Sequence, residues 1–334
     1  MTVRRPLSLL LALSCAVLLA GCGASAGEPA PSGAPAEGPA GAVAGFPVTL
    51  DDCGVRTTYD RPPRRAVSLN QHATEVMLAL GLQGSMAGTG YLDDKVLPEY
   101  RAAYDGVKVL SRRYPSYEAL LAEEPDFVYG GFSSAFDEKE GRGRDALGKA
   151  GIDTYLNVEQ CPSGPVDMDL MDREIRNVAT IFGVRERAEA LITRLHEPLA
   201  RVRERLADVE PVRLFVYDSG DKTAFTAGGR GVGDEIITLA GARNVFTDVD
   251  KAWADVSFEQ VAERAPDWIV VYDYGDEKVE DKKRFLLSNP ALADVPAIRH
   301  RRFAVLPLSS VVLGVRAPSA VESLARQIHP DRFE

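Results

Sequence analysis

The sequence predicts an α/β protein of two similar lobes, each with a central, mostly parallel sheet flanked by helices, and the first observation behind this is an internal repeat. Residues 116–127 and 257–268 share a Ser-aromatic-Glu block and a Pro-Asp-aromatic block at identical spacing. Upstream, residues 75–81 and 235–241 share a Glu that is followed by a Gly at the same distance. A repeat that occurs only twice indicates two lobes rather than a solenoid, which needs three or more short units. Two such lobes leave a ligand cleft between them.

The second observation is the alternation of short apolar runs with helical patterns. Segments 65–69 and 86–90 are expected strands, and the segment 74–80 between them has apolar residues at helical spacing. This β-α-β order predicts a parallel sheet. The remaining expected strands are 127–129, 154–158, 213–217, 244–246, 268–272 and 302–306, with helices at 117–123, 144–150 and 319–328 and a small hairpin formed by 46–50 and 55–59.

The third observation is a long helical stretch between the halves, 168–182 and then 185–206, which is interrupted at Gly183. We expect this stretch to join the two lobes stiffly, as one long helix. The expected divisions of the folded body are an N-terminal lobe at 46–165, an interlobe helical segment at 166–209 and a C-terminal lobe at 210–334.

The N-terminus has the pattern of an export signal. Arg4 and Arg5 precede an apolar run that is too short to span a bilayer comfortably. The run ends in Leu-Ala-Gly-Cys22, which resembles the lipobox of bacterial lipoproteins, so residues 1–21 are expected to be a lipoprotein signal peptide and Cys22 the lipidated residue. Residues 22–45 are mostly Ala, Gly, Pro, Ser and Glu and predict a flexible tether. We therefore expect a lipid-anchored protein on the outer face of the cytoplasmic membrane.

Charge and cysteine usage narrow the class of protein further. The formal net charge is −10, and it becomes −12 without residues 1–21, which contain two arginines and no acid. This balance disfavours nucleic acid, whose binding requires cations that neutralise phosphates. Cys53 and Cys161 are the cysteines left in the exported body, and we expect them to form a disulfide. The alternative is a pair of buried free thiols.

The repeat blocks also resemble a known family. Together with the lipobox, the segment 253–259 and the connecting helix, they are similar to the solute-binding proteins of ATP-driven importers for ferric siderophores, haem and cobalamin, over residues 46–329. The resemblance implies a monomeric receptor that docks on a permease dimer with its ATPase through one exposed glutamate on each lobe, here Glu118 and Glu259. Two carboxylates at equivalent points can meet two similar permease subunits. The alternative is that each glutamate only interacts favourably with the dipole of its own helix.

Candidate ligand-binding residues come from the loops after the expected strands, where parallel sheets bind ligands. Arg112 and Trp253 stand six residues before the two glutamates, at positions where the resemblance implies an arginine on the iron-binding oxygens and an aromatic ring stacked on a bulky ligand. For each candidate, surface exposure or lobe packing is the alternative role. The full set is Asn70, His72, Tyr91, Arg112, Arg113, Phe132, Tyr217, Arg230, Trp253, Tyr274 and Arg316.

Other functions have weaker signals. The glycine-rich loop 227–233 lacks the ending of a phosphate-binding Walker motif, and there is no G-x-S-x-G nucleophile motif. The four histidines form no metal-ligand spacing, so we expect no protein-bound metal, no intrinsic cofactor and no enzyme, with iron arriving only as a chelated ligand. The leading expectation is a ferric siderophore; a corrinoid is the next, and haem or a deazaflavin-type precursor follows. A structural surface lipoprotein or an enzyme would be the alternatives of a different class.

Overall fold

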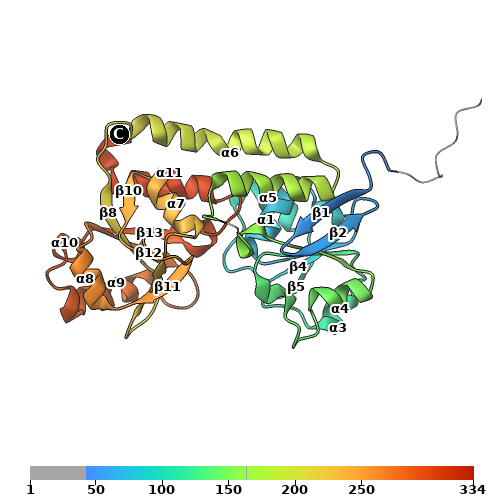
Figure 1. Cartoon of the computed structure of the whole chain (residues 1–334), viewed down its shortest axis with the longest axis horizontal. Helices are drawn as coiled ribbons and strands as arrows, with labels where there is room; N and C mark the ends of the chain where they lie inside the picture. The colour runs from blue at the N-terminus through green and yellow to red at the C-terminus, as the bar shows by residue number, and fades with distance from the viewer. Residues whose placement is uncertain (1–42, 163) are drawn as a thin grey trace, which may run out of the picture. The chain divides into compact units, whose positions relative to one another are not determined.

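The N-terminal half of the described chain is built on a parallel sheet (Figure 1). The computed structural model describes residues 43–162 and 164–334; the predicted signal peptide, Cys22 and nearly all of the tether lie outside the described residues. The strand order is β5-β4-β3-β6-β7, with every neighbouring pair parallel. The elements are β3 (Ala66–Leu69), α1 (Gln71–Ala79), β4 (Met86–Gly90), α2 (Arg101–Tyr104), β5 (Val109–Ser111), α3 (Tyr117–Leu121), β6 (Phe127–Gly130), α4 (Arg144–Lys149) and β7 (Asp153–Leu156).

The C-terminal half repeats the plan with a second parallel sheet, in the order β10-β8-β12-β13. The two central strands are largely buried, whereas the side chains of the edge strand β13 alternate between buried and partly exposed. Two helices, α5 (Met168–Ile181) and α6 (Arg185–Arg205), lie between the sheets in the sequence. The elements of this half are β8 (Val212–Tyr217), α7 (Val232–Leu239), β10 (Ala242–Asn244), α8 (Phe258–Arg264), β12 (Trp268–Asp273), α9 (Val279–Ser288), α10 (Pro296–Arg299), β13 (Phe303–Pro307) and α11 (Ala317–Ile328).

Two small antiparallel pairs accompany the sheets. The predicted hairpin is present as β1 (Val48–Asp52) and β2 (Val55–Tyr59). The second pair, β9 (Ala224–Ala227) with β11 (Trp253–Val256), was not expected from the sequence. It joins segments that lie far apart along the chain, and the pairing positions the aromatic residues described below.

The repeated Pro-Asp-aromatic block has the same structural role in both halves. The aspartate of each Pro-Asp-aromatic block accepts a hydrogen bond from the backbone of the neighbouring parallel strand: Asp126 from the Arg65 amide at 2.8 Å, and Asp267 from the Arg213 amide at 3.1 Å. Each aspartate thus ties the start of its own strand to the neighbouring strand of the sheet, β6 to β3 and β12 to β8. The aromatic residue that follows begins that strand.

The predicted helical stretch between the halves is two helices that run in opposite directions. Arg176 pairs with Glu189 at 2.7 Å and Asp172 with His196 at 2.9 Å, so residues earlier in α5 meet residues later in α6. The chain reverses at Gly183, whose φ of +68° favours glycine. Helix α6 alone then continues to the C-terminal half, where it packs beside α11 (Figure 1).

The predicted fold class, two α/β halves with mostly parallel sheets, is confirmed. The exact division into lobes stays a prediction, because residues 43–334 form one unit by their contacts. Within the two described ranges, none of the helices combines the length and the apolar composition needed to cross a bilayer.

Candidate functional site

A cavity of about 620 Å³ lies where loops of the two halves approach each other. Phe132 follows β6, Asp218 follows β8 and Leu308 follows β13, so the wall is built at the carboxyl ends of parallel strands from both sheets. Open α/β sheets bind ligands in the crevice outside the carboxyl ends of their strands. The other lining residues are Glu159, Gln160, Pro162, Gly164, Val166, Phe225, Arg230, Asp250, Ala252, Trp253 and Val312.

One wall of the cavity is aromatic. The Trp253 ring stacks on Phe225, with centroids 5.5 Å apart and planes inclined by 15°. The register of β9 and β11 explains the contact, because Phe225 lies opposite Asp255 and is the diagonal neighbour of Trp253 on the same face. The rings of Tyr272 and Trp253 form a T-shaped pair, with their centroids 5.9 Å apart. This arrangement presents a broad, preorganised apolar surface to a bulky ligand.

The charged groups of the wall are mainly acidic. Glu159, Asp218 and Asp250 line the cavity with a single cation among the described residues, Arg230, which forms an ion pair with Asp250. Glu159 Oε2 accepts a hydrogen bond from the Leu313 amide at 2.7 Å. Burial raises the pKa of Glu159 to about 7, and the Leu313 amide acts in the opposite direction.

Asp218 is the most buried of these acids, with an exposed fraction of 4%. Its Oδ1 atom has no hydrogen-bond partner among the described residues. Burial raises the pKa of Asp218, while the Tyr274 hydroxyl and the charge of Lys282 lower it. The buried Lys282 ammonium donates to the backbone oxygens of Asp218 at 2.6 Å and Tyr272 at 2.8 Å, and it lies over the Tyr274 ring.

Three of the eleven predicted ligand-binding residues line the cavity: Phe132, Arg230 and Trp253. Asn70 lies behind this wall, where its side chain accepts a hydrogen bond from the Phe132 amide at 3.2 Å. The ring of His72 packs on Phe132 at 4.7 Å. Both residues are buried and position Phe132 rather than line the cavity.

The other predicted residues lie elsewhere. Arg112 and Arg113 are exposed and do not line the cavity. Tyr91 packs edge-on against Tyr114 at 4.5 Å. The buried Tyr217 donates its hydroxyl hydrogen to the Gly220 carbonyl at 2.7 Å. Tyr274 covers Lys282, as described above. Ligand contact by these residues stays a prediction.

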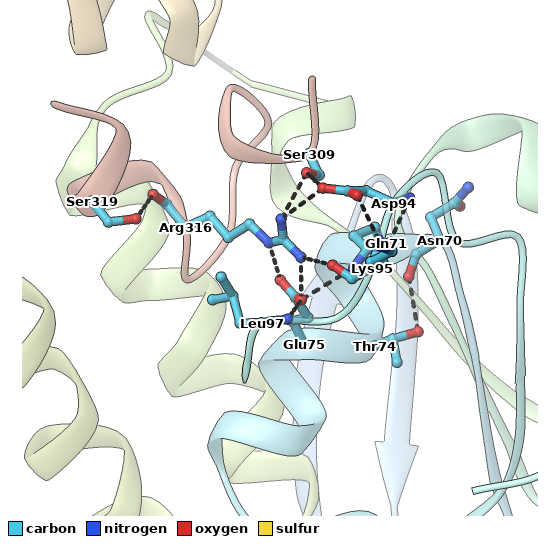
Figure 2. A network of polar contacts seen from close by, with 10 residues as sticks. All are labelled: Asn70, Gln71, Thr74, Glu75, Asp94, Lys95, Leu97, Ser309, Arg316 and Ser319. Carbon is cyan, nitrogen blue, oxygen red and sulfur yellow. Dashed lines mark hydrogen bonds and ion pairs between the residues drawn. The ribbon is translucent and has the colours of Figure 1, made fainter. Parts of the chain in front are cut away.

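Arg316 is buried in a polar network instead of facing the cavity (Figure 2). Its guanidinium binds both carboxylate oxygens of Glu75 at 2.6 Å each. It also donates to the Ser309 hydroxyl at 2.9 Å and to the Lys95 carbonyl at 2.6 Å. Asp94 lies 3.3 Å from the same guanidinium. The network joins the start of α11 to α1 and the loop after β4.

Sequence reasoning missed Glu159 and Asp250. The expected strand 154–158 ends at Leu156 in the structure, so Glu159 belongs to the loop at the strand's carboxyl end. The rule that selects loop positions after strands already covered this position, but no residue of this loop was among the candidates. Asp250 lies in the turn before β11, which no strand pattern indicated.

The two predicted docking glutamates occupy equivalent, exposed positions. Ser116 caps α3 by accepting from the Ala119 amide, and Ser257 caps α8 by accepting from the Gln260 amide, each at 3.2 Å. Glu118 and Glu259 are the second residues of these helices and are both exposed. Hydrogen bonds from its own amide and from Ser116 lower the pKa of Glu118.

Cys53 and Cys161 form a disulfide, with their Cα atoms 5.4 Å apart. With Asp52 they are also the one group of His, Cys, Asp or Glu side chains in the described ranges whose ligand atoms are close enough to share an ion. The sulfurs are bonded to each other, so this group does not offer thiolate ligands.

Comparisons with known proteins agree with the geometry. The model of the periplasmic binding protein family matches residues 67–309. An uncharacterized ABC transporter substrate-binding lipoprotein of Bacillus subtilis is 27% identical over 96% of both chains. A vitamin B12-binding protein of Yersinia pestis is 28% identical over 62% of this chain and 69% of its own length.

The solved structures similar to this chain include two that cover 85% of it. A periplasmic binding protein of Veillonella parvula is 33% identical, with a TM-score of 0.78 over 97% of its own chain. A protein of an ABC-type Fe3+-hydroxamate transport system of Saccharomonospora viridis is 24% identical, with a TM-score of 0.72 over 99% of its chain. At 24% identity, the similarity to the second structure shows a shared fold and not a shared ligand.

Proposed function

Since the chain belongs to the periplasmic binding protein family, we propose that it captures a ferric siderophore outside the cytoplasmic membrane and delivers it to the permease of an ABC importer. One relative of this chain is an ABC transporter substrate-binding lipoprotein and another is a vitamin B12-binding protein, so this chain acts as the substrate receptor. The proposal includes lipid anchoring through Cys22, a monomeric receptor and docking through Glu118 and Glu259. No intrinsic cofactor is proposed, because the iron belongs to the cargo.

The observation that carries the proposal is the cavity between loops of both halves. Its volume of about 620 Å³ falls within the range typical of small-molecule sites. Trp253 and Phe225 offer one broad apolar face, and Phe132 comes from the other half of the chain. A receptor built in this way can enclose a bulky chelate from two sides.

Haem fits the cavity less well. Protein-bound haem iron is usually held by a His, Cys, Met or Tyr side chain. Of these residue types, the described lining contains none, and the nearby His72 is buried behind Phe132. A corrinoid is the second candidate, favoured by the similarity to the vitamin B12-binding protein of Yersinia pestis.

Native mass spectrometry of the mature protein, purified from its own host under iron limitation, tests the proposal. We expect a retained mass that corresponds to a ferric chelate and disappears on denaturation. A corrinoid mass, or a preference for hydroxocobalamin over all ferric chelates in equilibrium titration, would overturn the siderophore assignment and leave the receptor role in place.

A further inference from the structure

The charges on the cavity wall limit which chelates it can bind well. Three lining carboxylates face one lining cation among the described residues, and Arg230 is already paired with Asp250. The remaining pair, Glu159 and Asp218, has no lining cation of its own. Above about pH 7, where Glu159 is ionised, charge complementarity therefore disfavours a polyanionic ligand, because like charges in one site repel each other.

The Asp218 carboxylate is the second feature of the cavity that bears on ligand choice. Its carboxylate is almost fully buried, lines the cavity and has an Oδ1 atom that accepts no hydrogen bond from the described residues. A buried acceptor without a donor costs free energy, so such groups are normally satisfied by a protein group, a water or a ligand. The Lys282 ammonium donates to two backbone oxygens and not to this carboxylate, although its charge and the Tyr274 hydroxyl lower the pKa of Asp218. Oδ1 itself is closed off from solvent, so a ligand donor would reach this carboxylate only through the small part of Asp218 that is exposed.

Glu159 stands on the opposite half of the chain and is fixed in place. Its Oε2 atom accepts from the Leu313 amide, so this carboxylate is held by the backbone of the C-terminal half while it lines the cavity. The aromatic wall of Trp253 and Phe225 lies in the same cavity and suits the apolar body of a ligand. The site thus combines an apolar face with acceptors from both halves.

We propose that the cavity selects ferric chelates that carry an ammonium or another strong hydrogen-bond donor, which binds Asp218 and Glu159, over polyanionic chelates. The preferred class is a hydroxamate chelate with a pendant amine, and the disfavoured class comprises tris-catecholates and carboxylates. This inference rests on the proposed function and specifies its substrate.

A matched pair of ligands tests the charge directly. Ferric desferrioxamine B carries a pendant ammonium, and its N-acetylated derivative has the same iron centre without that charge. At low salt the parent protein should bind the amine form roughly 10- to 100-fold more tightly, the range expected for one charge-assisted hydrogen bond. A ferric tris-catecholate should bind more weakly than either.

Two variants and one control locate the effect. Asp218→Asn should remove most of the preference for the amine form, while Asp276→Asn, an exposed acid outside the cavity, should keep it. Asp250→Asn frees Arg230 from its partner and should improve tris-catecholate binding by several-fold, and it tests the charge argument even if Asp218→Asn fails to fold. Thermal unfolding of each variant checks the fold.

The outcomes separate the two proposals. Equal binding of both hydroxamate forms, or tightest binding of the tris-catecholate, overturns the inference and leaves the siderophore receptor standing. Binding of hydroxocobalamin alone, with no response to any ferric chelate, overturns the proposed function and the inference with it.

Discussion

Arg316 at the start of α11 and Glu75 on α1 form a bidentate ion pair in which both nitrogen-oxygen distances are 2.6 Å (Figure 2). The exposed fractions of the two side chains are only 6% and 1%. Residues 241 positions apart in sequence are therefore joined by a buried charge pair. Removing one partner leaves the other charge buried and uncompensated, whereas removing both does not.

We therefore expect Arg316→Met to lower the free energy of unfolding by about 3–5 kcal/mol, as is typical for one partner of a buried pair. The double variant Glu75→Leu/Arg316→Met should recover most of that loss. Arg284→Met, which breaks an exposed pair with Asp281, should cost less than about 1 kcal/mol. Urea unfolding of the mature body measures all three, and equal losses in the single and double variants would contradict the argument.

The disulfide predicts a second effect on stability. Cys53 and Cys161 are 108 positions apart, so the bond restricts a long loop of the unfolded chain. The chain-entropy model gives an upper estimate of roughly 4–5 kcal/mol for such a loop. We expect Cys53→Ser/Cys161→Ser to lose stability in this range, and a reductant to destabilise the parent but not the variant. A parent protein that is unaffected by reduction would contradict this expectation.

Much of the fold could be predicted from the sequence because the repeat and the strand-helix alternation are local signals. The expected strand 65–69 and helix 168–182 differ from β3 and α5 by one residue at one end. The reversal at Gly183 could not be predicted, since an interrupted helical pattern is compatible with both a bend and a turn. The β9–β11 pair depends on contacts between distant segments, which periodicity does not report.

The cavity was harder to predict than the fold. Loop positions after strands gave Phe132 and Arg230, which line the cavity, but the same rule selected Arg316, which does not. Nothing in its sequence context shows that Glu75 lies within reach and neutralises it. Burial and charge pairing are decided by tertiary contacts, so a loop arginine in the sequence does not identify a ligand contact.

The exposed glutamates lead to a prediction about transport. Glu118→Arg and Glu259→Arg should each weaken coupling to the permease, and the double variant should abolish uptake, because charge reversal replaces attraction with repulsion at the interface. Ligand affinity should stay unchanged, since neither residue lines the cavity. Uptake of radioactive ferric chelate measures the first effect and equilibrium titration the second. Glu186→Arg, an exposed glutamate on α6, serves as the control.

Glu174 predicts how stability depends on pH. It accepts hydrogen bonds from the Tyr155 hydroxyl at 2.7 Å, the Val158 amide at 3.1 Å and the Tyr129 hydroxyl. Burial nevertheless raises the pKa of Glu174 from 4.5 to about 7. Between these values the folded protein holds a proton that the unfolded chain has released, so the free energy of unfolding falls as the pH rises through this window.

The slope from this one group is at most about 1.4 kcal/mol per pH unit. Glu174→Gln cannot ionise, so it should lose less stability than the parent between about pH 5 and about pH 7.5 in urea unfolding. Glu186→Gln, which changes an exposed carboxylate, should follow the parent. Parallel curves for the parent and Glu174→Gln would show that this carboxyl group does not titrate in that window.

Trp253 provides an optical test of where the ligand binds. It lines the cavity, whereas Trp268 starts β12 and packs against the hydrophobic core without lining the cavity. A ferric chelate absorbs visible light and should quench the emission of the nearer tryptophan. We therefore expect Trp253→Phe to lose most of the ligand-dependent quenching and Trp268→Phe to keep it. Because Trp253 stacks on Phe225, the Phe variant preserves an aromatic wall, so titration calorimetry should still detect binding. Quenching that survives in Trp253→Phe and disappears in Trp268→Phe would place the ligand outside this cavity.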